Sequence, residues 1–276
     1  MQDIKISIDE GAIRYATDRV LQVFGRDELT RKAREDLTAH IKIATQYAAV
    51  VQCIGMATPI PIGDIYQRTR LVSSAGGQAS VQGLIDGQED AIIFAKAGEG
   101  KTTLLHWLYN QFIHDPLTLP LLITLRRRAE ATFLRELIGH LRFRRVSARL
   151  KGGRILLLVD GYDEIGEEDR RQVSDALLNF QSLNVGSFLL TARTYYDVYE
   201  LKVARYDIAP FHKEDSLAFI KSFANAYGAD IQAADLYDEL SEHGLRDFAS
   251  HPLLLAMLCI LKTGPMRALP RNLRNL

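Results

Sequence analysis

The chain has 276 residues, of which 47% are hydrophobic and 25% are charged, and its formal net charge is zero. This composition is typical of a soluble globular protein, and a neutral chain has no overall attraction to nucleic acid or anionic membranes. Cys53 and Cys259 lie far apart in apolar surroundings, which favours buried free thiols over a disulfide framework or a metal site. The N-terminus lacks a signal-peptide core, and the longest apolar run, residues 252–261, is about half a membrane span. We therefore expect a cytoplasmic protein without membrane contact.

The first part of the chain reads as helical. Apolar residues recur at spacings of three and four between residues 9 and 56. Prolines at 59 and 61 break this pattern, and the small polar residues at 73–83 predict a linker or mobile loop.

From residue 91, short apolar runs alternate with helical stretches. The runs are residues 91–95, 119–125, 155–160, 187–192 and 206–211, and the helical stretches are residues 101–114, 129–150 and 168–183. Continuous apolar strands separated by helices predict a parallel sheet that is covered on both faces. After residue 212 the pattern predicts helices only, including a buried one that begins near His251.

The stretch AKAGEGKTTLL, residues 95–105, has the context of a phosphate-binding P-loop, because it follows one of these strands and opens a helix. Gly98 and Gly100 allow backbone angles that turn N–H groups toward a phosphate, and the helix adds its positive end. We assign the Lys101 ammonium to the β- and γ-phosphates and the Thr102 hydroxyl to Mg²⁺. Ala95 stands where the pattern has glycine, and we expect its extra methyl to be tolerated. The predicted nucleotide contacts in this loop are Ala97, Gly98, Glu99, Gly100, Lys101, Thr102 and Thr103.

Three acids follow the strand ILLLVD, residues 155–160. Asp160 ends the strand, where open α/β sheets bind ligands, and we assign it to Mg²⁺ together with Thr102. Asp163 and Glu164 are the candidates to activate or orient a water at the γ-phosphate. The alternative is a solvated loop, which we accept for the acids at 167–169 because acids are favoured at a helix N-terminus. Arg193, after the next strand, either senses the γ-phosphate or is a surface arginine.

These motifs predict an α/β fold: a P-loop NTPase parallel sheet flanked by helices, with an N-terminal helical region and a small C-terminal helical subdomain. We expect ATP rather than GTP, because the chain has no Asn-Lys-x-Asp element that would read guanine.

Three segments together resemble the NACHT group of STAND NTPases, which includes animal NOD-like receptors and bacterial antiphage proteins. They are AKAGEGKTTLL, KGGRILLLVDGYDEI and FLLTAR. The resemblance covers about residues 60–276. It says nothing of residues 1–55, which are helical by their apolar spacing alone. Together the two arguments predict an N-terminal helical region at 1–58, a linker at 59–88, a NACHT nucleotide-binding core at 89–211 and a helical subdomain at 212–276. The resemblance also implies that Pro252 lies near the adenine, and likens the Leu-Pro pair at 269–270 to the end of the family's helical segment.

The resemblance implies a switch in immune or antiviral signalling. Such a protein binds ADP in a closed monomer, exchanges it for ATP on sensing a trigger, hydrolyses ATP slowly and oligomerises. The trigger is unknown. The family continues into a winged-helix domain and a sensor, so a chain ending at Leu276 is either a fragment or an unusually short member. Two alternatives stay open: an AAA-like motor subunit, and a nucleotide-binding adaptor that does not hydrolyse.

An arginine-rich segment spans residues 126–154. It is either a face that binds nucleic acid or a partner, or a solvated helix face with a loop, and we favour the solvated face. Phe143 is the only aromatic among the later arginines, which argues against a base-stacking platform, although nucleic acid is not excluded.

Overall fold

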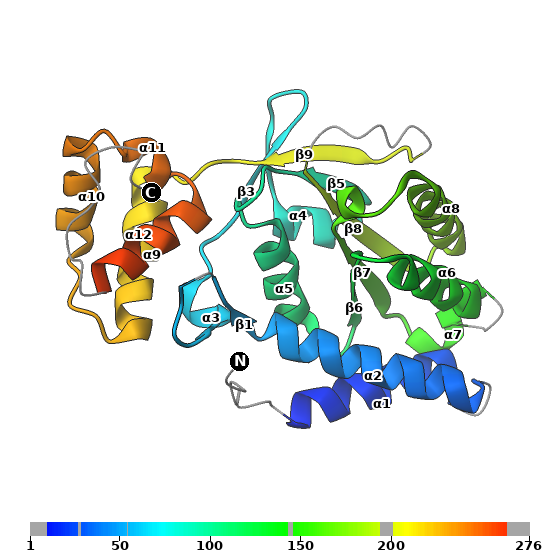
Figure 1. Cartoon of the computed structure of the whole chain (residues 1–276). Coiled ribbons are helices and arrows are strands. Elements are labelled where there is room, and N and C mark those ends of the chain that lie inside the picture. The colour runs from blue at the N-terminus through cyan, green and yellow to red at the C-terminus, as the bar shows by residue number, and fades with distance from the viewer. Residues whose placement is uncertain (1–9, 27–28, 54, 143–145, 194–200, 264–276) are drawn as a thin grey trace.

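A seven-stranded sheet forms the centre of the molecule (Figure 1). The computed structural model describes residues 10–26, 29–53, 55–142, 146–193 and 201–263. The strand order is β4-β3-β9-β5-β8-β7-β6, and the last five of these strands are parallel. The parallel strands are β5 (Ala91–Phe94), β6 (Thr118–Thr124), β7 (Arg154–Asp160), β8 (Gly186–Ala192) and β9 (Ala204–Ile208). The first four of these strands have continuous apolar sequences that match their burial on both faces, whereas β9 is mixed in sequence and mostly half-buried.

Helices cover both faces of the sheet, as predicted. They are α5 (Lys101–Phe112), α6 (Arg128–Arg142), α7 (Val146–Leu150) and α8 (Glu167–Leu183). The connection from β5 to β6 runs toward the β6 edge of the sheet. The connections from β6 to β7 and from β7 to β8 run in the opposite direction, back toward β5. Because parallel crossovers are right-handed, α5 lies on one face and α6 and α8 lie on the other.

Two N-terminal helices, α1 (Glu10–Phe24) and α2 (Arg31–Ala48), pack on each other, and α2 also packs against α5 and β6. Thr30 caps α2 by accepting the Ala33 N–H at 3.2 Å. The predicted helix up to residue 56 is wrong at its end. After Ala48 the chain forms a short ladder of β1 (Val50–Val51) with β2 (Ile60–Pro61), followed by α3 (Ile62–Ile65). The helical spacing of apolar residues does hold up to Ala48. After it, Val50 and Val51 pair with Ile60 and Pro61 as strands and so cannot continue the helix.

The predicted linker at residues 73–83 is also wrong. This segment is a hairpin of β3 (Arg70–Ser73) and β4 (Gln78–Ser80), followed by α4 (Val81–Asp86), and β3 joins the main sheet antiparallel to β9. The small residues form the turn, where Gly76 has a φ of 83° and the Ser73 hydroxyl accepts the Gly77 N–H at 3.0 Å. Turn chemistry, rather than disorder, explains this composition.

Four helices follow the sheet and form a second hydrophobic cluster. They are α9 (Lys213–Tyr227), α10 (Ala233–Glu242), α11 (Arg246–Ala249) and α12 (Pro252–Thr263). Met56, Ile60 and Ile65 belong to this cluster although they precede the sheet in sequence. The predicted boundaries at residues 58, 88 and 211 stay a prediction, and the Leu-Pro pair at 269–270 lies outside the described residues. Over the described part of the chain, no helix is long and apolar enough to cross a membrane.

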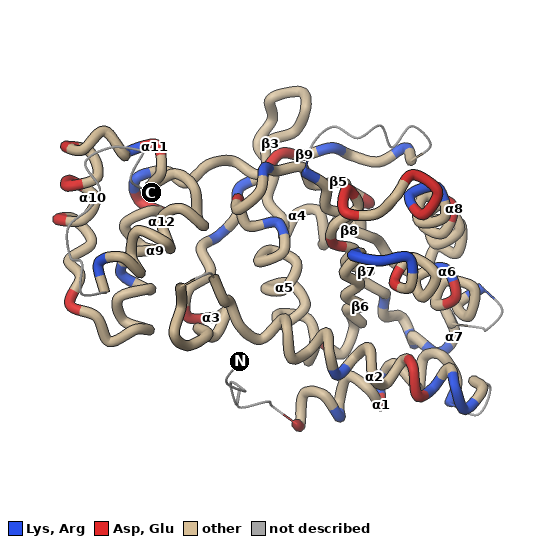
Figure 2. Tube along the Cα trace, viewed as in Figure 1, with Lys and Arg blue, Asp and Glu red and all other residues tan. Residues whose placement is uncertain are grey.

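Charged residues of both signs are spread over the chain (Figure 2). In the arginine-rich segment, Arg128 lies 3.7 Å from a Glu168 oxygen and 3.8 Å from an Asp169 oxygen, and Arg154 donates to the Thr118 hydroxyl at 3.3 Å. Residues 143–145 of the segment lie outside the described part. Arg128 and Arg154 are thus engaged within the chain.

Candidate functional site

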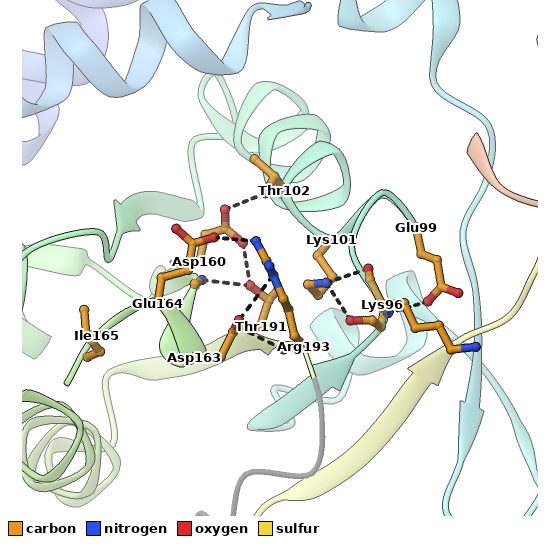
Figure 3. Close-up of polar contacts among 12 residues, drawn as sticks. Lys96, Glu99, Lys101, Thr102, Asp160, Asp163, Glu164, Ile165, Thr191 and Arg193 are labelled. Atoms are coloured by element: carbon orange, nitrogen blue, oxygen red, sulfur yellow. Dashed lines mark hydrogen bonds and ion pairs between the residues drawn. The ribbon is translucent and has the colours of Figure 1, made fainter. Parts of the chain in front are cut away.

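The loop between β5 and α5 has the backbone that its glycines predict. Gly98 and Gly100 have φ values of 81° and 94°, in the left-handed region that other residues resist. The Lys101 ammonium lies inside the loop and donates to the carbonyls of Ala95 at 2.6 Å and Lys96 at 2.8 Å (Figure 3). Burial lowers the pKa of Lys101, and the charges of Asp163 and Asp160 oppose that shift. The cation therefore lies within the glycine loop, where the sequence motif predicts a phosphate-binding lysine.

Asp160 ends β7 and is buried beside the first turn of α5. One carboxylate oxygen accepts the Thr102 hydroxyl at 2.7 Å, and the other accepts the hydroxyl of Thr191 on β8. The Thr191 oxygen in turn accepts the Gly161 N–H at 3.1 Å. β8 lies between the P-loop strand β5 and β7, so Asp160 belongs to the second strand from the P-loop strand.

The chain has a P-loop NTPase fold. The glycine loop lies at the carboxyl end of β5 in a parallel sheet, and Asp160 of β7 lies beside the helix that this loop opens. The sequence motifs predict this arrangement.

Asp163 and Glu164 lie in a 3₁₀ turn at Tyr162–Glu164, directly after Asp160. Gly161 starts the turn with a φ of 84°, and the buried Tyr162 hydroxyl lies 3.0 Å from that of Ser174. This anchoring was not predicted, because Tyr162 carries no motif of its own. It fixes the turn so that both acids can face Arg193.

Arg193 pairs with both acids. Its backbone N–H donates to Asp163 at 2.9 Å, and its guanidinium lies 3.3 Å from Asp163 and 3.6 Å from Glu164. The Asp163 side chain is only 7% exposed, whereas Glu164 is 41% and Arg193 54% exposed. Figure 3 shows the three side chains pointing toward one another beside Asp160 and Thr191.

All the predicted site residues line one cavity of about 250 Å³. They are Ala97, Gly98, Glu99, Gly100, Lys101, Thr102, Thr103, Asp160, Asp163, Glu164, Arg193 and Pro252. The acids at 167–169, which we expected to be a solvated helix start, occupy the first turn of α8 and are not among the lining residues.

Sequence reasoning missed the other wall of the cavity. It includes Val51, Cys53, Met56, Ile65, Tyr66, Gln67, Arg68, Arg70 and Phe211. Most of these come from the segment between α2 and β3, which we predicted to be helix end and linker. Tyr66 stacks on Trp107 of α5, with ring centroids 4.5 Å apart and planes 12° apart. In the sequence of that segment, only the prolines and the single aromatic residue Tyr66 indicate an ordered structure.

The helical region touches the P-loop directly. The Leu253 N–H donates to the Gly98 carbonyl at 3.2 Å, and a Cβ on Gly98 would lie 2.8 Å from the Leu253 Cβ. Glu99 accepts the Lys96 N–H at 2.5 Å and lies 3.6 Å from His251. The loop is thus held between the sheet and the start of α12.

The donors at the carboxyl end of β7 suit Mg²⁺, which prefers hard oxygen ligands and retains several waters. Thr102 and Asp160 supply a hydroxyl and a carboxylate oxygen 2.7 Å apart. Within the described residues, no group of three or more His, Cys, Asp or Glu side chains is arranged to hold a metal ion by itself. A Mg²⁺ at this place would therefore need the oxygens of a nucleotide as well.

No protein-family model and no curated protein matches the chain. Among solved structures, the chain is similar to the Thermotoga maritima RuvB Holliday junction branch migration motor, with a TM-score of 0.41 at 14% identity. Two point variants of the same protein give TM-scores of 0.40 at 13% identity. The matched part covers 62% of this chain and 53% of the RuvB chain, so this chain spans about half the length of RuvB. Similarity at this level assigns no function.

Proposed function

We propose that the protein is an ATP-binding, slowly hydrolysing switch of the NACHT type, whose nucleotide controls self-association in an immune or antiviral response. The observation that carries the nucleotide part is the bond between Thr102 and Asp160. It joins the first turn of the P-loop helix to the acid of β7, beneath the glycine loop. A chance glycine-rich turn has no reason to place a hydroxyl and a strand-end carboxylate in contact.

Each part of the cavity has a role toward MgATP. The N–H groups of the loop and the Lys101 ammonium bind the β- and γ-phosphates, and Thr102 with Asp160 holds Mg²⁺. When bound, the ion neutralises charge on the phosphate oxygens. The apolar wall, with Val51, Met56 and Pro252, takes the base.

Asp163 and Glu164 are the residues that would orient or deprotonate a water at the γ-phosphate. Arg193 now pairs with both, so a γ-phosphate would compete with the two carboxylates for its guanidinium. Movement of Arg193 toward phosphate would release Glu164, the more exposed acid, to act as base. This coupling makes the acids active only when a triphosphate is in place.

The contact between α12 and the P-loop supports a switch. Gly98 contacts Leu253 of α12, Glu99 lies beside His251 directly before α12, and Arg70 of β3 pairs with Asp215 of α9 at 2.7 Å. A rearrangement of the phosphate loop therefore changes contacts of the helical region, which gives the nucleotide a route to a conformational change.

Thermal unfolding tests nucleotide binding. At about one hundred times its Kd, MgATP or MgADP stabilises a protein by roughly 2.7 kcal/mol, which is about 5–10 °C for a chain of this size. Lys101→Ala should abolish this shift. Lys96→Ala is the matched control, since Lys96 is exposed, lies in the same loop and does not line the cavity. An equal shift in wild type and Lys101→Ala would remove the P-loop assignment.

Single-turnover hydrolysis tests the acids. Glu164→Gln should retain ATP binding and lose cleavage, and Asp163→Asn would show which acid acts on water. Equal cleavage by wild type and both variants would favour an adaptor that does not hydrolyse. Fast steady-state turnover without nucleotide-dependent oligomers would favour a motor. Tightly bound ADP in the purified protein would favour the switch.

A further inference from the structure

Tyr66 is held in place on the wall of the cavity by its backbone, its ring and its hydroxyl. It ends α3, where its N–H donates to the Ile62 carbonyl at 2.9 Å. One face of the ring stacks on Trp107 of α5, with ring centroids 4.5 Å apart and planes 12° apart. The hydroxyl donates to the Thr69 hydroxyl at 2.9 Å and accepts the Thr69 N–H at 3.3 Å. The ring therefore has a fixed orientation before any ligand binds.

The second face of this ring is the part left to border the cavity. Tyr66 lines the cavity and is partly buried, whereas Trp107 does not line it. Both side chains pack against the hydrophobic cluster of the sheet. Because Trp107 covers one face of the Tyr66 ring and Thr69 engages the hydroxyl, the opposite face remains for a ligand.

The helical region supplies further apolar side chains to the same cavity. Met56, Phe219 and Ala256 line it and belong to the second hydrophobic cluster. The cavity thus has an aromatic ring from the sheet side and apolar side chains from the helical side. This combination suits a flat ring system, because aromatic rings stack in parallel and the apolar side chains exclude water from them.

We propose that the base of the bound nucleotide stacks on the second face of the Tyr66 ring. The proposal rests on the proposed function, because the nucleotide must occupy this cavity with its phosphates at the glycine loop. It names a residue of the base site that no sequence motif marks. The base would be joined through Tyr66 to Trp107 of α5, the helix that also carries Thr102 at the phosphate end.

Calorimetric titration with MgADP and with magnesium tripolyphosphate tests the proposal. Tyr66→Leu keeps an apolar side chain and removes the aromatic ring. It should weaken MgADP binding about tenfold, which is within the contribution of one base–aromatic stack. Tripolyphosphate has no base, so its binding should stay unchanged. Tyr66→Phe keeps the ring and should bind MgADP nearly like wild type. Tyr47→Leu, at an exposed site on α2 outside the cavity, is the matched control and should bind both ligands like wild type.

A measurement on the wild type alone needs no variant to fold. Trp107 is the only tryptophan, and its ring stacks on Tyr66. Saturating MgADP should change the Trp107 emission more than saturating magnesium tripolyphosphate does, because only MgADP carries a base. Equal changes with the two ligands would contradict the stack.

The outcomes separate the two proposals. If wild type binds neither ligand, or binds MgADP but not tripolyphosphate, the phosphate site of the proposed function fails. If wild type binds both and Tyr66→Leu keeps full affinity for MgADP, Tyr66 does not contact the base. Equal losses of both ligands in Tyr66→Leu would show that Tyr66 only supports the shape of the cavity. A loss in Tyr66→Phe as large as in Tyr66→Leu would also overturn the role of the ring.

Discussion

Thr191 offers a sharp test of the carboxylate cluster, because its hydroxyl joins Asp160 at the end of β7 to the turn that follows. The side chain is fully buried, donates to Asp160 and accepts the Gly161 N–H at 3.1 Å. Thr191→Val keeps the shape and removes both bonds. A bond to a charged group contributes about 1.5–3 kcal/mol, and a buried donor without a partner costs about 1–3 kcal/mol. We expect a loss of at least about 2.5 kcal/mol.

Thr191→Ser is the matched control, since it keeps the hydroxyl and removes one methyl, at a cost of roughly 1 kcal/mol. Urea unfolding can be followed through Trp107, the only tryptophan, which lies on α5. The valine variant should be less stable than the serine variant by about 1.5 kcal/mol or more. The valine variant should also bind MgATP more weakly, because Asp160 loses the bond that orients it. A valine variant as stable as the serine variant would refute the hydrogen-bond network.

Two further predictions concern stability and access to the cavity. Gly186→Ala should destabilise the fold by about 4 kcal/mol or more, because its Cβ would lie 1.8 Å from the Ile155 carbonyl oxygen. Gly139→Ala, in α6 with open space around it, is the control and should stabilise the fold by about 0.5–1 kcal/mol. Denaturant unfolding measures both variants. Equal stability changes in the two variants would contradict the β7–β8 register. Cys53 lines the cavity and Cys259 is fully buried, so maleimide should label Cys53 alone, and MgADP should slow the labelling. Burial raises the pKa of both thiols, that of Cys259 to about 12, so labelling of Cys53 should accelerate as pH rises, as mass spectrometry would measure. Labelling of Cys53 that nucleotide leaves unchanged would remove the cavity as the binding site.

The parallel strands could be predicted because burial on both faces demands continuous apolar runs. The predicted run at 119–125 is β6, which spans Thr118–Thr124, and the run at 155–160 is β7, which spans Arg154–Asp160. The last strand is shifted, since residues 206–211 were expected and Ala204–Ile208 is observed. Its position is set by pairing with β5 and β3 rather than by its own hydrophobicity. β3 and β4 escaped prediction because short strands beside a glycine turn have no apolar run to mark them.

The end of the cavity that the glycine loop and the acids line could be predicted from local motifs, whereas the opposite wall could not. Phosphate binding depends on backbone angles and a few side chains within one loop, so its residues are contiguous in sequence. The opposite wall depends on which apolar surfaces meet. Ile65 and Phe219, for example, are far apart in sequence and belong to one hydrophobic cluster. Nothing in either local sequence encodes that contact.

Gly98 connects the glycine loop of the cavity to the helical region. The sequence explains this glycine by its left-handed backbone, and the structure adds a second requirement, since any Cβ would collide with Leu253. The Gly98 carbonyl also accepts the first free N–H of α12 after Pro252, which has none to give. A phosphate that reorients the loop must therefore either keep this bond and move α12, or break it. In both cases binding of a phosphate would change the contact between the P-loop and the helical region, as the proposed nucleotide switch requires.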